Sequence, residues 1–135
     1  MPKKRLSKAK QYAKLAIVFN RWVRRRDCNG EAGTKCISCQ KWYPFEKLHG
    51  GHYHHSKSSI LRFDERNVHA QCGFNCNTSR GGNLIEYRIN LCKKIGEDQV
   101  KEIESIRHQP LKMSPTEIKE KIEYYKLKLR QYADS

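Results

Sequence analysis

The chain has few apolar residues and no long apolar run. Of its 135 residues, 37% are hydrophobic and 31% are charged, so folding can bury only a modest core. The first residues, MPKKRLSKAK, are charged and no apolar segment of usable length follows them. We therefore expect neither a secretory signal nor a membrane partner. These absences favour a cytoplasmic protein, in which cysteines stay reduced.

Acidic side chains are scarce near the N-terminus. Residues 1–27 carry ten basic side chains and a single acidic one, Asp27, and the whole chain has a net charge of +14. A basic surface on a short chain predicts a polyanionic partner, and nucleic acid is the commonest polyanion. The alternatives are a solvated face that only aids solubility, or acidic lipid, for which we find no lipidation signal.

Helical periodicity occurs in four segments of the chain. Apolar residues recur at three- and four-residue steps in residues 6–26, 84–95 and 97–107, which predicts three amphipathic helices. A fourth helix is expected from Ser114, which is followed by a proline and a capping-box glutamate. Its apolar residues form a heptad-like seam that would pack on the N-terminal helix or on a second subunit: Ile118, Ile122, Tyr125, Leu129 and Tyr132.

Six cysteines in a cytoplasmic chain indicate metal ligands before disulfides. Cys36 and Cys39 form one pair, and a second pair lies about thirty residues later at Cys72 and Cys76. Two such pairs suit a tetrahedral Zn(II) site with four thiolates, and a redox role for the first pair is the weaker alternative because the second pair exists. Two cysteines lie outside this pattern. Cys28 is a spare or alternative ligand, and Cys92 is expected to be a thiol in the core.

Histidine and asparagine residues around the cysteine pairs complete a larger pattern. His52 follows two glycines, Asn67 lies five residues before the second cysteine pair, and Asn77 directly follows that pair. These motifs together resemble the HNH, or ββα-metal, nucleases. The string CISC...GGHY...LRFDERNVHAQC...CN...GGN..EYR, over about residues 21–95, is similar to the phage NinG/Rap family of recombination endonucleases. The layout also resembles that of the phage junction-resolving enzyme endonuclease VII.

The resemblance implies an α+β fold with three parts. Residues 1–27 would form a basic amphipathic helix. Residues 28–95 would form a small zinc-bound ββα-metal (HNH-like) core, beginning with a turn-rich linker over residues 27–35. Residues 96–135 would form a C-terminal helical extension that could support a homodimer.

The resemblance also implies a role for each matching residue. His52 would be the general base that takes a proton from the attacking water. Asn67 would brace the loop that carries His52. Asn77 would be a ligand of a catalytic Mg(II) or Mn(II), which would stabilise charge on the scissile phosphate. The zinc would be structural, because its four positions are filled.

One position departs from the common HNH pattern. Many HNH enzymes carry a metal-binding Asp before the catalytic His, whereas this chain has Gly51. Our first candidate for the missing ligand is His54, because on an extended strand it lies on the same face as His52. Water can fill several positions on Mg(II). Weaker candidates are Asp64, His69 and Glu86.

The implied substrate is branched DNA, such as a Holliday junction or a D-loop. A two-fold symmetric junction would suit a dimer, and the family implies a phage origin and action in the host cytoplasm. We expect phosphates to be held by basic residues of the N-terminal helix and of the core: Lys10, Lys14, Arg21, Arg24, Arg25, Arg62, Arg66 and Arg80. The alternatives are a zinc-finger-like nucleic-acid-binding module without catalysis, and a zinc-stabilised structural adaptor.

Overall fold

The basic N-terminal segment forms helix α1, Lys8–Cys28, in the computed structural model, which describes residues 6–132. The Ser7 side chain accepts from a backbone N–H of the first turn, and Asn29 ends the helix in the left-handed conformation. The predicted apolar stripe is confirmed, and the helix begins and ends two residues later than predicted. Its buried residues are Leu15, Val18, Phe19, Trp22, Val23 and Cys28.

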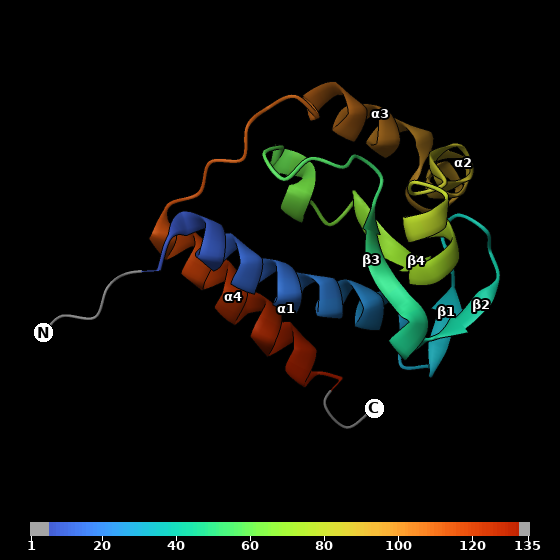
Figure 1. Ribbon diagram of the computed structural model, residues 1–135, viewed down its shortest axis with the longest axis horizontal. Helices are drawn as coiled ribbons and strands as arrows, with labels where there is room; N and C mark the ends of the chain where they lie inside the picture. The colour runs from blue at the N-terminus through green and yellow to red at the C-terminus, as the bar shows by residue number, and fades with distance from the viewer. Residues whose placement is uncertain (1–5, 133–135) are drawn as a thin grey trace, which may run out of the picture.

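Short strands and three further helices follow α1 (Figure 1). The strands are β1 (Gly33–Lys35), β2 (Trp42–Pro44), β3 (Leu48–His52) and β4 (Val68–Cys72). The single-turn segments are η1 (Phe45–Lys47), η2 (Ile60–Phe63) and the wider π-helical η3 (Gly73–Ser79). The later helices are α2 (Leu84–Ile95), α3 (Glu97–Ile106) and α4 (Pro115–Arg130). The fold is therefore mixed α+β, with small sheets.

The strands form two antiparallel pairs. β1 pairs with β2, and β3 pairs with β4 in a register that runs from Leu48 opposite Cys72 to His52 opposite Val68. Figure 1 shows β3 and β4 in the middle of the molecule, with α1 on one side and α2 on the other. All five residues of β4 are buried. The linker predicted over residues 27–35 is partly wrong, because it contains the end of α1 and all of β1.

Two hydrophobic clusters hold the helices. In the first, α4 lies against α1 (Figure 1), with Ile118 and Tyr125 buried beside Phe19 and Trp22. The other seam residues of α4 also pack on this cluster: Ile122, Leu129 and Tyr132. The seam thus packs on α1 of the same chain, which is one of the two partners that the sequence left open. The second cluster joins α2 and α3 through Tyr87, Leu91, Val100 and Ile103.

The helix ends follow the sequence signals closely. The helix predicted over residues 84–95 is α2, and it stops at Gly96, whose φ of 95° favours glycine. The capping box that starts α4 is present, with Ser114 and Glu117 bonding each other's backbone N–H groups. Within residues 6–132, none of the helices has both the length and the apolar character that crossing a membrane requires.

Side chains from the end of α1 cover the free edge of β4. Arg26 donates to the Val68 carbonyl at 2.7 Å, and Asp27 accepts from the Ala70 N–H at 2.7 Å. The Ile37 N–H donates to the Ala70 carbonyl at 3.0 Å. These bonds satisfy backbone groups that an edge strand would otherwise expose. They also fix the turn between β1 and β2, and helix α1, against the same strand.

Candidate metal centre and histidine cleft

Four cysteines meet at one point between the two strand pairs. Cys36 and Cys39 lie in the turn between β1 and β2, Cys72 ends β4, and Cys76 lies in η3. Their sulfur atoms all lie within 4.8 Å of one another. This arrangement brings together the two pairs predicted from the sequence, and it fits a structural metal such as Zn(II).

Backbone groups are arranged to support thiolates at this centre. The N–H groups of Ser38 and Cys39 donate to the Cys36 sulfur at 3.4 Å, and that of Cys76 donates to the Cys72 sulfur at 3.3 Å. Burial raises the pKa of Cys36 to about 12, so this thiol would stay protonated without a nearby cation. A bound Zn(II) supplies that positive charge, and the donor set therefore fits the ion.

The two remaining cysteines lie outside this centre. Cys28 is buried against Leu48 and Ala70, and it is not part of the four-sulfur group found among the described residues. The suggestion that it is an alternative ligand is therefore not supported. Cys92 packs beside the α2–α3 cluster, as expected for a core thiol.

His52 lies at the end of β3 and faces a cleft between α1 and the loop that follows the strand. The cleft has a volume of about 420 Å³ and is lined by Ala16, His52, His55, Ser56, Lys57 and Arg62. The His52 Nε2 atom is 2.9 Å from the carbonyl oxygen of Arg62. Burial lowers the pKa of His52, and this effect outweighs the hydrogen bond to the Arg62 carbonyl, which raises the pKa. His52 is therefore neutral at neutral pH.

Asn67 ties the loop after β3 to the strand that follows it. Its Oδ1 accepts from the His54 N–H at 2.9 Å, and its Nδ2 donates to the carbonyls of His54 and Leu61 at 3.2 and 3.0 Å. Asn67 is fully buried. These are the contacts that a brace of the His52 loop needs, because they fix the chain two residues beyond His52.

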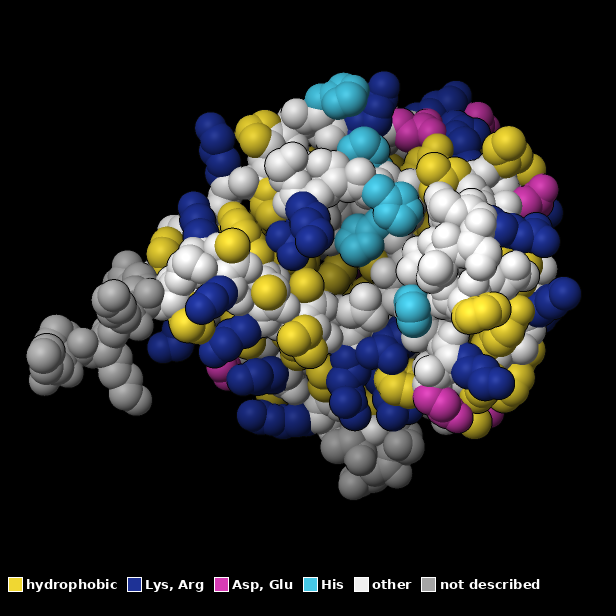
Figure 2. All heavy atoms as spheres, viewed as in Figure 1, with side chains coloured by type: hydrophobic (Ala, Val, Ile, Leu, Met, Phe, Trp, Pro, Cys, Tyr) yellow, Lys and Arg dark blue, Asp and Glu magenta, His cyan; other side chains and the backbone are white. Residues whose placement is uncertain are grey.

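Asn77 does not line the His52 cleft. It lies in η3 directly after Cys76, and its Nδ2 is 3.2 Å from Nδ1 of His49. His49 precedes His52 by three residues on β3. Sequence reasoning assigned His49 no functional role, although it begins the cluster of four histidines in residues 49–55. Figure 2 shows histidine side chains in a row along one face of the molecule.

His54 does not share a strand face with His52, so that expectation is wrong. β3 ends at His52, and His54 turns toward His108, with ring centroids 6.4 Å apart. His54 lines a different cavity, of about 720 Å³, beside Tyr53 and Arg88. The strand stops because the chain beyond His52 is bonded to Asn67 rather than extended along β4. The structure therefore does not bring His54 together with Asn77.

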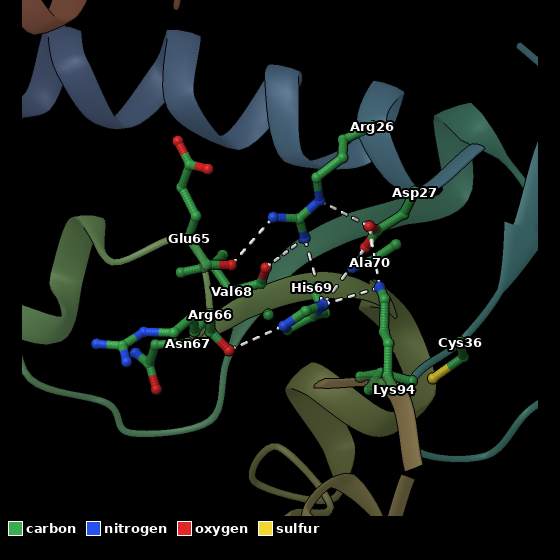
Figure 3. A network of polar contacts seen from close by, with 12 residues as sticks. Arg26, Asp27, Cys36, Glu65, Arg66, Asn67, Val68, His69, Ala70 and Lys94 are labelled. Carbon is green, nitrogen blue, oxygen red and sulfur yellow. Dashed lines mark hydrogen bonds and ion pairs between the residues drawn. The ribbon is translucent and has the colours of Figure 1, made fainter. Parts of the chain in front are cut away.

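The weaker candidates for the missing ligand are also placed elsewhere. Asp64 pairs with Arg66 at 2.8 Å, and Glu86 is exposed on α2. His69 lies in a buried polar network with Asp27 and Lys94 (Figure 3). Its Nε2 faces the Arg66 carbonyl at 2.9 Å, and its Nδ1 accepts from the Lys94 amine at 2.8 Å. Both ring nitrogens are thus in use.

The charges in this network fix two protonation states. Burial opposes ionisation of Asp27, but Arg26 and Lys94 outweigh it and lower the pKa of Asp27 to about 2. Burial and the Lys94 charge lower the pKa of His69 to about 3. A charged Asp27 and a neutral His69 therefore hold Arg26 and Lys94 at the end of α1. This role is structural.

The predicted phosphate-binding residues differ in their exposure and in the side chains that they contact. Lys10, Lys14, Arg21 and Arg80 are exposed. The guanidinium groups of Arg24 and Arg25 lie over the Phe45 ring, at 4.6 and 3.7 Å. Arg62 lies over the Tyr12 and Phe63 rings at the edge of the His52 cleft. Figure 2 shows Lys and Arg side chains gathered over α1 and α4.

Arg66 is the exception among these basic residues. It bonds both carboxylate oxygens of Asp64 and lies 3.1 Å from Glu102. These two carboxylates compensate its charge, so Arg66 has little left to offer a phosphate.

A family model described as Bacteriophage Lambda NinG protein matches residues 1–134 of the chain. The chain belongs to this NinG family. Protein ninG of Salmonella phage P22 is 38% identical over 117 residues, which cover 86% of this chain and 54% of that protein. Protein ninG of Enterobacteria phage H19B is 50% identical over 87 residues, which cover 64% of this chain and 40% of that protein. The same coverage and 40% identity are found for Protein ninG of Escherichia phage lambda.

The NinG relationship confirms the family that the motifs indicated. The matched part spans about half of the relatives' length or less, and their names state no activity. No solved structure matches the chain significantly. What this NinG chain does is therefore argued from its own site.

Proposed function

We propose that this NinG chain is a metal-dependent DNA endonuclease of the HNH (ββα-metal) type. The observation that carries the proposal is His52, a neutral imidazole held in a basic cleft by a backbone carbonyl. The order of elements supports it, since an antiparallel pair, β3 and β4, is followed by a helical segment that carries Asn77 beside a zinc ligand.

The contact with Arg62 decides which nitrogen of His52 can act as a base. A carbonyl oxygen only accepts, so the neutral ring must carry its proton on Nε2 and donate it to Arg62. Nδ1 is then the unprotonated nitrogen, and it can take a proton from an attacking water. Burial keeps the pKa of His52 below its ordinary value, so the base stays available at neutral pH.

A catalytic Mg(II) or Mn(II) belongs to the proposal, and its donors would come from η3 and β3 rather than from the lining of the His52 cleft. Asn77 offers an amide oxygen, and His49 offers a ring nitrogen 3.2 Å from the Asn77 amide nitrogen. When bound, the ion would stabilise charge developing on the phosphate and the leaving oxygen. Lys57 and Arg62 at the cleft would hold the neighbouring phosphates.

The proposed substrate is branched DNA. The exposed basic residues of α1 and the cleft would contact phosphates, which select DNA shape without reading bases. The NinG relatives are phage proteins, so we place the activity in the cytoplasm of the host cell. A homodimer would match the symmetry of a four-way junction. It would need a surface other than the α4 seam, which packs on α1.

A second candidate is a zinc-stabilised DNA-binding module without catalysis. One observation favours it: Asn77 contacts His49 and does not line the His52 cleft. Such a module would keep the four cysteines and the basic face, and His52 would then only fix the loop through Arg62.

A cutting assay separates the two candidates. Zinc-loaded protein is incubated with a labelled four-way junction, or with a linear duplex of the same arm sequence, in Mg(II), in Mn(II), or without added divalent ion. Buffer without divalent ion is a better control than EDTA, which would also compete for the zinc. We expect nicks near the branch point that require the added ion. Tight binding to the junction without any cutting would instead establish the binding module.

A further inference from the structure

Gln71 on β4 carries a buried oxygen without a partner. The residue is fully buried, and its Nε2 donates to the Gly82 carbonyl and, at 2.9 Å, to the Ser38 hydroxyl. Its Oε1 is the one buried side-chain polar atom in residues 6–132 for which no hydrogen-bond partner is found. An unpaired buried acceptor costs about 1–3 kcal/mol of stability. Such a group calls for an explanation.

The orientation of this carboxamide is fixed by its neighbours. The Gly82 carbonyl can only accept, so the Gln71 nitrogen must face it. Exchanging the amide oxygen and nitrogen would place two acceptors against each other. The free oxygen therefore points away from Gly82, over strand β3.

The free oxygen occupies the space of a side chain at position 51. A Cβ built on Gly51 would come within 3.0 Å of Oε1, Cβ and Cδ of Gln71. Gly51 directly precedes His52, and it is the position where the common HNH pattern has a metal-binding Asp. The Gln71 oxygen from β4 thus lies where the carboxylate of an Asp at position 51 of β3 would begin.

Two other glycines, Gly73 and Gly82, leave space that histidine rings occupy. A Cβ on Gly73 would collide with the His49 ring, and one on Gly82 would lie 2.9 Å from Nε2 of His55. Gln71 is the register partner of His49, and its amide bonds Gly82. Gln71 thus lies opposite His49 across the strand pair, and His49 in turn contacts Asn77.

We propose that the Gln71 side-chain oxygen is a ligand of the divalent cation. It supplies the oxygen that Gly51 lacks. The proposal rests on the proposed endonuclease, because it concerns the cation of that site. Amide oxygens are ordinary ligands of Mg(II) and Mn(II), and coordination would satisfy the unpaired acceptor. The zinc-side hydroxyl of Ser38 and the Gly82 carbonyl would then orient the ligand.

Calorimetric titration of zinc-loaded protein with Mn(II) tests this role without an activity assay. Gln71→Met keeps the length of the side chain but removes the oxygen, and we expect it to weaken Mn(II) binding by more than about tenfold. Gln109→Met is the matched control, because it makes the same substitution at an exposed glutamine outside the site. Its Mn(II) affinity should stay within about threefold of the wild-type value.

An exchange of donors between the strands gives a second test if Gln71→Met folds poorly. Gly51→Asp alone should destabilise the protein, since Gln71 fills the space of the new side chain. The double variant Gly51→Asp with Gln71→Ala clears that space and returns an oxygen from β3. We expect it to fold, to keep its zinc and to bind Mn(II) at least as tightly as the wild-type protein.

The two proposals fail in different ways. A folded, zinc-loaded Gln71→Met protein with wild-type Mn(II) affinity would overturn the ligand role, even if the protein cuts DNA. A wild-type protein that cuts DNA but binds no Mn(II) would overturn it too. Mn(II) binding that depends on Gln71 in a protein that never cuts DNA would leave the cation site standing and remove the endonuclease.

Discussion

Among single residues, His69 links three parts of the molecule through one buried ring. It lies on β4, accepts from Lys94 on α2 and lies 3.3 Å from Arg26 on α1. Burial lowers the pKa of His69 to about 3 in the folded protein. In the unfolded chain, His69 takes up a proton near the ordinary histidine pKa of about 6.5. Its contribution to stability is complete above that pH and is lost as the pH falls toward 3.

We therefore expect the free energy of unfolding to decrease on acidification below about pH 6.5. The slope due to His69 approaches about 1.4 kcal/mol per pH unit. Urea denaturation between pH 7 and pH 5 measures it. His69→Gln should flatten the slope, while His108→Gln should not, since His108 is exposed in the folded protein. Equal slopes for the wild-type and His69→Gln proteins would contradict the role of His69.

The site residues show what the sequence can and cannot predict. The four clustered cysteines and Asn67 follow fixed spacings, and the structure brings the four sulfurs together. The contact between Asn77 and His49, and the position of Gln71 over Gly51, depend on strand register. No local pattern encodes register in a strand with two glycines. The only sequence signal that His55 and Lys57 line the cleft was the run of histidines that ends two residues before a lysine.

Among the elements, α4 forms part of the main hydrophobic core. The Tyr125 ring lies 5.0 Å from the rings of both Phe19 and Trp22, and its hydroxyl donates to Glu65 at 2.8 Å. This contact crosses from the C-terminal helix to α1 and to the turn before β4. The spacing of apolar residues predicts which face of α4 is buried. It does not predict whether α1 or a second subunit covers that face.

Two substitutions of Tyr125 separate its ring from its hydroxyl. Tyr125→Ala should cost about 3–5 kcal/mol of stability, as expected for losing a buried aromatic ring. Tyr125→Phe keeps the ring and should cost about 1–3 kcal/mol, because the Glu65 carboxylate loses a donor. Chemical denaturation gives both values. A cost below about 1 kcal/mol for Tyr125→Ala would show that α4 is not part of the core.

The helices can be predicted from the sequence more accurately than the short strands can. Helices α2 and α3 are local apolar patterns separated by Gly96, and α4 begins with a capping box, so these boundaries could be predicted to within a residue or two. Strands β1 and β2 have three residues each, too few for an alternating pattern. The turn between them is closed by backbone hydrogen bonds, in which Cys36 donates to Lys41 and accepts from Gln40, both at 2.9 Å.

At the scale of the whole molecule, the metal centre joins parts that have little core of their own. It connects the β1–β2 turn to β4 and η3. Binding of structural Zn(II) contributes about 10–16 kcal/mol in small zinc domains. This is comparable to the whole stability of a typical domain, about 5–15 kcal/mol. Losing the metal is therefore expected to unfold the chain.

We predict that Cys39→Ser abolishes zinc binding and the cooperative thermal transition. Cys92→Ser, outside the four-sulfur group, should keep one zinc per chain and its transition. Elemental analysis and circular dichroism measure both effects. A folded, zinc-free Cys39→Ser protein would contradict the structural role of the metal.

The central claim is that His52 acts as the base in a zinc-supported DNA endonuclease, and single-turnover cutting of a labelled four-way junction tests it most directly. With Mn(II) present, His52→Ala should cut about 10²–10⁴-fold more slowly than the wild-type protein, with unchanged zinc content and junction affinity. His108→Ala, an exposed histidine, should cut at the wild-type rate. If zinc-loaded His52→Ala cuts the junction as fast as the wild-type protein, the account is wrong.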